Sequence, residues 1–311
     1  MQRLKDERGA VAVMVALLMV PLIGFAAIAI DVAGMYSEQQ QLQTGADAAA
    51  FAIAQNCNRS ACGDTAATAQ NFSTKNINSS NAYTASVTAQ TSSSVTVQNG
   101  GDRKHWFAPV LGIKSNTLSA RATVNWGSPT AGTALLPLAF SWCEWKEQTG
   151  GALPSGTTSR LIYLSKTSGT TDCTGPSNNV VPGGFGWVTT DPGTCHTTSS
   201  INGLLNSDPG KSMPSSCSEQ DLVKLQGTRI LLPVFDSHEG NGSGATYRVF
   251  GYAAFVLTGY YFGNQNKWNS PCNGNDRCIR GYFTKFVDSS EAFTVGPGGP
   301  QLGGSIISLT Q

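Results

Sequence analysis

The residues best suited to chemistry are eight cysteines, and their number favours structural disulfide bonds. An even number of cysteines in a chain exposed to an oxidising compartment is typical of disulfide pairing. The turn-rich loops 57–62 and 272–278 can each close locally. Although spacing alone does not determine a pairing, we expect the remaining four to pair as 143 with 173 and 195 with 217. The disulfide candidates are Cys57, Cys62, Cys143, Cys173, Cys195, Cys217, Cys272 and Cys278.

The sequence has only three histidines, His105, His196 and His238. The Cys195-His196 pair suggests zinc binding or a thiol nucleophile, but zinc ligands in proteins usually come in pairs separated by about two to four residues. His238-Glu239 precedes a Gly-, Asn- and Ser-rich segment and has no second histidine one helical turn away, as a zinc protease would need. We therefore interpret His238 as part of a loop tip and expect no metal site.

Other patterns that serve enzymes or binding modules are weak. Gly240, Gly242 and Gly244 form a GxGxG, but a predicted strand follows them, so the helix N-terminus that binds phosphate is missing. No GxSxG, P-loop or paired-carboxylate pattern occurs, so we expect neither catalysis nor a cofactor. Six tryptophans could line a glycan-binding face, although Trp142 and Trp145 flank a cysteine and such aromatics are more often core.

Charge also limits the possible partners. Charged residues are 13% of the 311-residue chain and the formal net charge is +1. A nucleic-acid partner would need a basic face, so we expect none. The chain is long enough for one large domain or two small ones.

Residues 9–30 form an apolar run without any charged residue. As a helix they would rise about 33 Å, enough to cross a hydrocarbon core of about 30 Å. The run predicts an uncleaved transmembrane helix, in which Pro21 is tolerated. A cleaved secretory signal, which has a shorter apolar core, and a buried soluble helix are the alternatives.

The flanking charges predict the orientation. Arg3, Lys5 and Arg8 precede the run, and the next basic residue is Arg59. Because basic residues favour the cytoplasmic side, residues 1–8 should be cytoplasmic and everything after residue 30 should lie outside.

The helix should continue beyond the span to residue 56, because no proline interrupts it. Apolar residues recur there at helical spacing, with Glu38, Gln39, Gln40, Gln43 and Asp47 interpreted as lying on the other faces. The stripe would pack on its own domain or on another subunit. It consists of Met35, Leu42, Ala46, Ala49 and Ile53.

The remaining chain predicts an α+β fold. After the helix we expect a small module with a strand hairpin at 81–98 that turns near 91–94, a break at Gly100–Asp102, a short amphipathic helix from Trp106 to Gly112, and a strand at 117–126. Beyond it, strand-like runs occur at 135–140, 160–164, 184–188, 229–235, 246–262 and 281–287. The run 246–262 is too short and too rich in β-branched and aromatic residues for a second span.

The expected organisation follows from these elements: a cytoplasmic tail at 1–8, a transmembrane helix at 9–30, its extracytoplasmic extension at 31–56, a small α+β module at 57–127, a linker at 128–134, and a β-rich, disulfide-containing domain at 135–311.

The N-terminal segment resembles the TadE/TadG-like proteins of the tight-adherence (Tad) apparatus, which assembles Flp-type pili. The resemblance covers residues 7–52, and the segment to about residue 127 resembles the TadG-like continuation more loosely. It is carried by the apolar span and by Gly9, Asp31, Tyr36, Leu42, Gln43 and Asp47.

The resemblance implies a minor structural or assembly component in the bacterial cytoplasmic membrane, with the lipid bilayer and other pilus-assembly subunits as partners. A membrane-anchored adhesin with a cell-surface or glycan ligand is the alternative, and an anchored secreted enzyme is the third. Some TadG-like proteins carry a metal-binding adhesion domain with a DxSxS motif. The nearest segment is Asp236-Ser237-His238-Glu239-Gly240. It has His238 where the motif has its first serine, which argues against such a site.

One departure from related pilins bears on processing. Processed pilins of this class are cut after the glycine and carry Glu at the fifth residue of the mature chain. The corresponding residue after Gly9 is Met14. Because a carboxylate inside the bilayer is costly and needs a purpose, its absence favours an uncleaved anchor over a polymerising pilin.

We expect the full chain to sediment with membranes and to require detergent for release, because the apolar span has no polar face. The intact mass of the extracted protein should retain residues 1–9. Recovery of the intact chain in the soluble fraction without detergent would contradict the anchor, and a mass that begins after Gly9 would contradict its uncleaved state.

Overall fold

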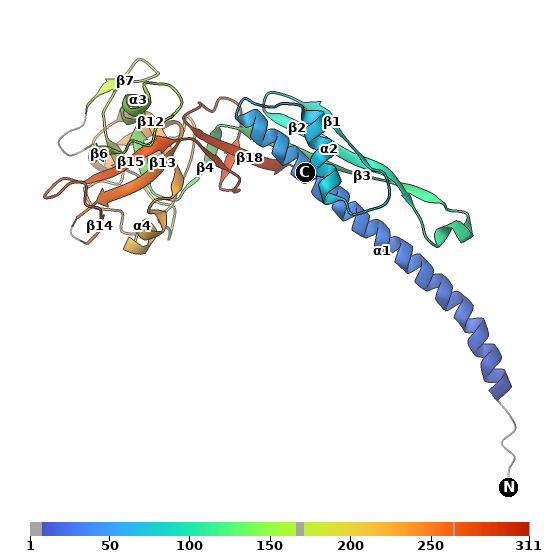
Figure 1. Ribbon diagram of the computed structural model, residues 1–311. Coiled ribbons are helices and arrows are strands. Elements are labelled where there is room, and N and C mark those ends of the chain that lie inside the picture. Colours follow the sequence, from blue (N-terminus) through green and yellow to red (C-terminus); the bar gives the residue numbers. More distant parts are fainter. Residues whose placement is uncertain (1–7, 166–170, 264, 311) are drawn as a thin grey trace, which may run out of the picture. The chain divides into compact units, whose positions relative to one another are not determined.

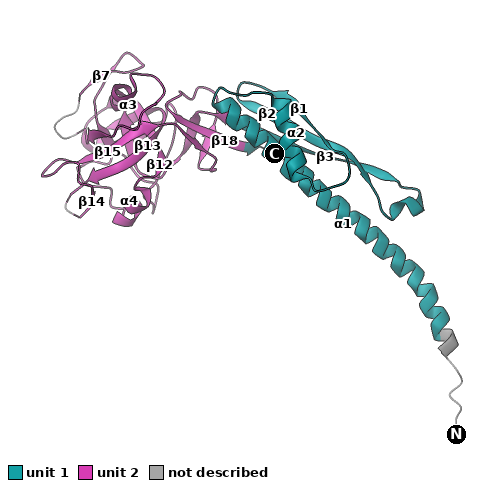
Figure 2. Cartoon of the chain, viewed as in Figure 1, with its two compact units in different colours: residues 1–125, 309–311 teal, residues 126–308 magenta. Residues whose placement is uncertain are grey.

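The computed structural model describes residues 8–165, 171–263 and 265–310. Two compact units are distinguished in Figure 2: unit 1 comprises residues 1–125 and 309–311, and unit 2 comprises residues 126–308. Of the expected cytoplasmic tail at 1–8, only Arg8 lies within the described residues, so Arg3 and Lys5 are outside them.

Unit 1 combines a very long helix with a hairpin-based sheet (Figure 1). Its elements are α1 (Arg8–Asn58), α2 (Thr65–Asn76), β1 (Thr84–Gln90), β2 (Ser94–Lys104), the 3₁₀ helix η1 (Ala108–Leu111) and β3 (Ser115–Gly127), whose last two residues belong to unit 2. The end of β18 (Gly304–Thr310) also reaches unit 1, where the Thr310 hydroxyl donates to the Thr123 carbonyl at 3.3 Å.

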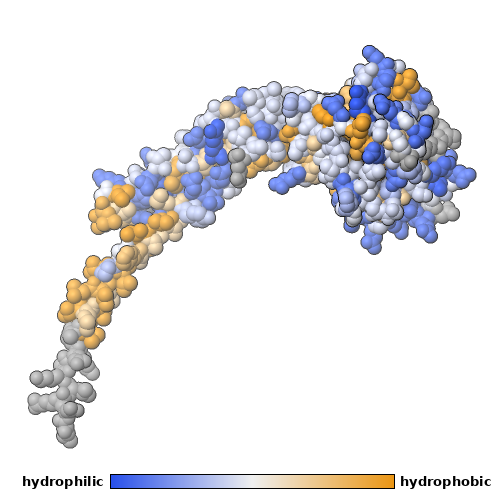
Figure 3. Space-filling view, turned by 180° about the vertical axis from the view of Figure 1, so that it is seen from behind, coloured by the Kyte–Doolittle hydropathy of each residue, from blue (hydrophilic) through white to orange (hydrophobic). Residues whose placement is uncertain are grey.

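Helix α1 confirms the single continuous helix expected over 9–56, including its passage through Pro21. Within the described residues, Val11–Asn58 is one helix long and apolar enough to cross a membrane. The side chains of its first part are exposed, and Figure 3 shows this part as an apolar, orange rod. An exposed apolar rod of this length is what a membrane span requires.

Beyond the span, α1 packs on its own unit against α2 and β2. Leu42, Ala46, Ala49 and Ile53 are fully buried, which confirms most of the predicted stripe. One prediction was wrong: Glu38, placed on another face, lies three residues after Met35 and four before Leu42 and so points toward β2. Its charge disguised its position on the buried face.

Strands β1, β2 and β3 pair antiparallel in that order, as part of a larger sheet. The hairpin turn expected near 91–94 is confirmed by the Thr91 N–H, which donates to the Ser94 carbonyl at 2.9 Å. The break expected at Gly100–Asp102 was wrong, because β2 continues to Lys104. A Cβ at Gly101 would overlap the Ala82 carbonyl, so glycine permits a close backbone approach there and the strand does not end.

Unit 2 is β-rich, as expected. Its strands and helices are β4 (Pro129–Ala134), β5 (Leu138–Ser141), α3 (Trp142–Thr149), β6 (Arg160–Tyr163), β7 (Cys173–Thr174), β8 (Val180–Val181), β9 (Phe185–Trp187), β10 (Thr197–Ser200), β11 (Leu204–Asn206), α4 (Glu219–Leu225), β12 (Arg229–Glu239), η2 (Gly242–Gly244), β13 (Thr246–Tyr261), β14 (Lys267–Trp268), β15 (Cys278–Thr284), β16 (Phe286–Asp288), β17 (Phe293–Val295) and most of β18.

The main sheet of unit 2 has the order β6-β15-β13-β12-β5-β9, and a smaller sheet has the order β10-β4-β17. Strand β13 is the single long core strand that was one of two possibilities for 246–262. The expected linker at 128–134 instead contains β4, which pairs with β10 and β17 on its two sides. Small residues in β4, such as Gly132 under the Phe293 ring, gave it the composition of a linker.

Four disulfides join the pairs that we expected: Cys57–Cys62 in unit 1, and Cys143–Cys173, Cys195–Cys217 and Cys272–Cys278 in unit 2. The first closes the turn between α1 and α2. The second ties the short helix α3 to the short strand β7, across 30 residues of sequence.

Candidate functional site

The candidate site lies in unit 1, where α1 leaves the apolar span and meets the end of the β2–β3 hairpin. Asp31 is the first residue after the span and its side chain is almost fully buried, with 3% of the residue exposed. Its carboxylate accepts hydrogen bonds from three consecutive backbone N–H groups, those of Trp106 at 2.9 Å, Phe107 at 3.0 Å and Ala108 at 2.7 Å. One side chain of the helix thereby holds the end of the hairpin.

The hairpin end is built to offer those donors. Its base closes where the His105 N–H donates to the Lys114 carbonyl at 3.1 Å. The chain then enters η1, which has no capping side chain of its own and ends at Gly112, a residue with a φ of 88°. The first N–H groups of a helix have no acceptors within the helix. Here the carboxylate of Asp31, which belongs to α1, is the acceptor that caps them.

The electrostatics of Asp31 follow from this arrangement. Burial raises the pKa of its carboxyl. The three backbone N–H donors and the nearby His105 together lower the pKa by more, so it lies below its ordinary value of 3.8. The carboxylate is therefore charged in the folded protein at neutral pH.

A buried arginine makes the second contact between the hairpin and α1. Arg103 of β2 is 1% exposed. Its Nε lies 3.1 Å from Oε1 of Glu38, and its Nη1 donates to the Asp31 carbonyl at 3.2 Å. A Cβ at Gly34 would overlap the guanidinium, so the helix can receive this side chain only where it has a glycine.

Glu38 is held from two further directions. The Tyr83 hydroxyl donates to Oε2 of Glu38, and Nδ2 of Asn81 donates to the same oxygen at 3.2 Å. Burial and the acceptance of this bond by the Glu38 carboxylate raise the pKa of Tyr83. A charge removed from water is tolerated only when it is paired and hydrogen-bonded, and Glu38 satisfies both conditions.

The same pattern, a polar side chain of β2 received at a glycine of α1, recurs further along the helix. Asn99 of β2 is fully buried and its Nδ2 donates to the Leu42 carbonyl at 3.0 Å. A Cβ at Gly45 would lie 2.9 Å from that nitrogen. Two glycines of α1 thus receive two polar side chains of β2, which fixes the register of the helix against the strand.

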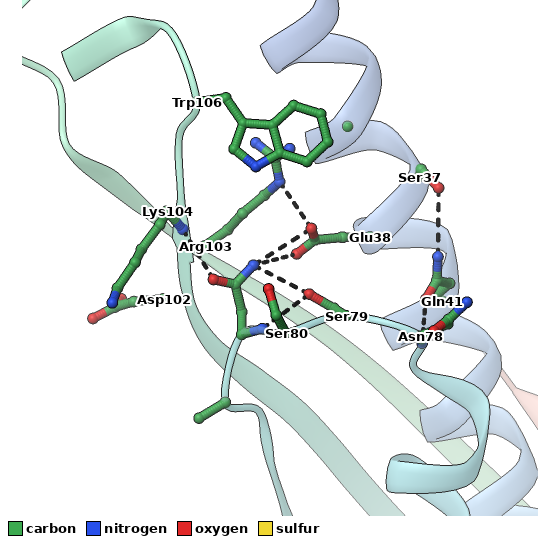
Figure 4. A pocket seen from close by; sticks show the side chains of 13 residues that line it. Ser37, Glu38, Gln41, Asn78, Ser79, Ser80, Asp102, Arg103, Lys104 and Trp106 are labelled. Atoms are coloured by element: carbon green, nitrogen blue, oxygen red, sulfur yellow. Dashed lines mark hydrogen bonds and ion pairs between the residues drawn. The ribbon is translucent and has the colours of Figure 1, made fainter.

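A polar groove of about 910 Å³ opens beside this contact (Figure 4). Its walls come from α1, the segment 78–82 and the end of β2, and in Figure 4 Trp106 stands next to Arg103 at one side. The Asn78 N–H donates to Oε1 of Gln41 at 2.6 Å, and the Lys104 N–H donates to Oδ1 of Asn81 at 3.3 Å. The groove is lined by hydrogen-bonding groups, several of which bond to one another.

The structure separates the residues that carried the resemblance. Asp31 and Leu42 face the hairpin and the core, whereas Tyr36 is 68% exposed on the outside of α1. Nε2 of Gln43 donates to Oδ1 of Asp47 at 2.8 Å and to the Arg121 carbonyl at 3.1 Å, which ties α1 to β3. Gly9 lies in α1 near its beginning.

Sequence reasoning missed Gly34, Glu38 and Arg103. A signal for the first two was present, because Gly34 and Glu38 follow Asp31 by three and seven residues and so share its helical face. Nothing in the local sequence links Arg103 to them, since it lies 65 residues beyond Glu38 and meets it only through tertiary folding.

The other candidates for chemistry are placed as follows. Within residues 8–165, 171–263 and 265–310, no group of three His, Cys, Asp or Glu side chains could hold a metal ion. His238 and Glu239 were wrongly assigned to a loop tip, because they end strand β12 and pair with β13. Asp236 is buried in a bidentate contact with Arg248, at 3.0 and 2.7 Å.

The tryptophans do not form a common face. Trp145 and Trp187 are buried in the core of unit 2, and Trp142 stacks on Trp145 at a centroid separation of 4.7 Å. Trp106, in unit 1, is largely exposed.

Comparison with known proteins places a family match on α1. Residues 9–56 match the family model described as "Putative Flp pilus-assembly TadE/G-like". The matched segment contains the apolar span, Asp31, Gly34, Glu38 and the buried stripe, and the resemblance seen in the sequence is confirmed. No curated protein and no solved structure matches the chain significantly. The TadE/G-like match supports a role in pilus assembly and contact with other pilus components.

We predict that acid releases the hairpin end from α1. The pKa of Asp31 is lower in the folded protein than in the unfolded chain. The charged Asp31 carboxylate therefore stabilises the fold fully above the unfolded pKa, and this stabilisation is lost below about pH 4, as the pH falls through the folded pKa. Hydrogen exchange of the amides of residues 106–108, corrected for the intrinsic rate, should lose protection in that window. Asp31→Asn, which keeps the shape but not the charge, should show lower protection that does not change there. Protection in the wild type that is unchanged down to pH 2 would contradict this.

Gly34→Ala should weaken the packing of β2 on α1, although alanine is the better helix former. The new methyl would displace the buried guanidinium of Arg103, and overpacking of this kind costs about 1–3 kcal/mol. Exchange protection of β2 amides in detergent-solubilised protein measures the loss. Gly24→Ala is the matched control, because nothing lies within 4 Å of a Cβ there. Equal behaviour of the two variants would show that Gly34 has no packing role.

Proposed function

We propose that this chain is a membrane-anchored minor structural or assembly component of a Tad-type Flp pilus apparatus. The first part of α1 would cross the cytoplasmic membrane once, with the N-terminus inside the cell and everything after residue 30 outside. Its partners would be the lipid bilayer and other pilus-assembly subunits.

The observation that carries this proposal is the extent of the family match. It covers residues 9–56, which include the apolar span and also the face of α1 that binds the hairpin. An ordinary signal anchor needs only the span. The match therefore includes the residues of α1 that bond the helix to the sheet of unit 1. Such contacts suit a protein that must hold a domain at a defined distance from a membrane.

Two further observations support a tether in place of a polymerising pilin or an enzyme. Met14 stands where a processed pilin would carry Glu, so the span offers no carboxylate to a neighbouring amino terminus. The carboxylates of Asp31, Glu38 and Asp236 are each bound by donors that hold one element of the fold to another, which supports a structural role for them.

Deletion of the gene in its bacterial host should abolish surface pili while pilin still accumulates in the cells, because assembly and not pilin synthesis is lost. Pilin in the sheared and cellular fractions, with electron microscopy of the cells, measures this. The full chain supplied in trans should restore pili. Normal pili with reduced attachment would contradict the assembly role and favour the adhesin, and normal pili with normal attachment would contradict both.

A further inference from the structure

The end of the β2–β3 hairpin is the largest exposed apolar feature outside the span of α1 within the described part of unit 1. We define the hairpin tip as residues 106–113. Five of its side chains are large and apolar, with 44% to 89% of each residue exposed; they are Trp106, Phe107, Val110, Leu111 and Ile113. Within unit 1, Figure 3 shows them as a second orange patch beside the orange rod of α1.

The position of the hairpin tip relative to the helix is fixed. The carboxylate of Asp31 holds the backbone of residues 106–108, and Asp31 follows the last apolar residue of the span, Ile30. A helix rises only about 1.5 Å per residue, so the held backbone lies at the level where the span ends. If the span fills the hydrocarbon core, the hairpin tip lies at the outer membrane–water interface.

The chemistry of the hairpin tip suits that interface. The indole of Trp106 favours the headgroup level, where its ring is buried and its N–H stays wet, and the ring of Phe107 adds apolar surface to the same face. Lys104, the last residue of β2, and Lys114, the residue before β3, are exposed and lie on either side of the tip in the sequence. Their ammonium groups can reach anionic headgroups while their stems lie along apolar surface.

We propose that the hairpin tip inserts into the outer leaflet of the membrane that α1 crosses, so that unit 1 contacts the bilayer at two points. A single helix can tilt and rotate in a bilayer, whereas a second contact at the same level restricts both motions. Asp31 then has a double role, since it marks the end of the span and positions the inserted tip. This inference rests on the membrane anchor of the proposed function.

The test uses the full chain reconstituted at high dilution into vesicles of phosphatidylcholine and phosphatidylglycerol, with or without brominated acyl chains. The fluorescence of Trp106 is obtained as the difference between the wild type and Trp106→Phe. We expect a roughly twofold fall of this difference in brominated vesicles, because interfacial tryptophan rings reach the upper acyl chains. Trp126→Phe is the matched control, since Trp126 is buried in the protein and should contribute no lipid-dependent quenching.

Each other outcome overturns the inference in a distinct way. Quenching of Trp106 by iodide in permeabilised vesicles, with no effect of brominated lipid, would place the tip in water. Protection from both quenchers would show that protein covers the tip, from a second copy or from elsewhere in the chain. Failure of the chain to float with the vesicles would overturn the anchor itself, whereas flotation with either of the preceding results overturns only the insertion of the tip.

Discussion

The bond between the Asp31 carboxylate and three successive backbone N–H groups is the contact on which the outer part of unit 1 depends. It lies at the first residue beyond the apolar span, where the charge is buried by protein and satisfied by backbone donors. A carboxylate bonded to backbone donors is a strong and directional contact. It fixes where the end of the hairpin lies relative to the helix.

The contacts next to it explain why a helix and a strand can share so many buried polar groups. Arg103 and Asn99 point from β2 toward α1 and meet it at Gly34 and Gly45. Glycine normally weakens a helix by about 1 kcal/mol, so its use at both places indicates that close approach matters more than helix propensity. The buried ion pair of Arg103 with Glu38 is weak evidence for stability but strong evidence for a defined register, because a shift along the helix would leave both charges unpaired.

These features bear on the proposed role in pilus assembly. A flexible anchor would let the sheet of unit 1 sample many orientations relative to α1, whereas a helix that is bonded to the sheet holds it in one orientation. The polar groove beside Glu38 and the apolar hairpin tip lie close together in unit 1, since Trp106 belongs to both. One face of the protein would then combine a contact with lipid and a surface of amides and hydroxyls for another protein.

The sequence by itself determined the elements whose signal is local. The uncharged run of residues 9–30 predicts a span by length alone, the stripe from Leu42 to Ile53 predicts the helix extension, and short turn-rich loops predict their own disulfides. Alternation of apolar residues identified the strands of unit 1, and apolar runs identified some of the strands of unit 2, including β12, β13 and β15. Only the tertiary structure revealed the candidate site. Glu38, Asn99 and Arg103 occupy inward-facing positions, and because they are polar they interrupt the apolar periodicity by which a sequence indicates the buried face of a helix or strand. Their partners across the contact between α1 and unit 1's sheet lie more than forty residues away in sequence, and burial of a polar group depends on a partner that local sequence does not identify.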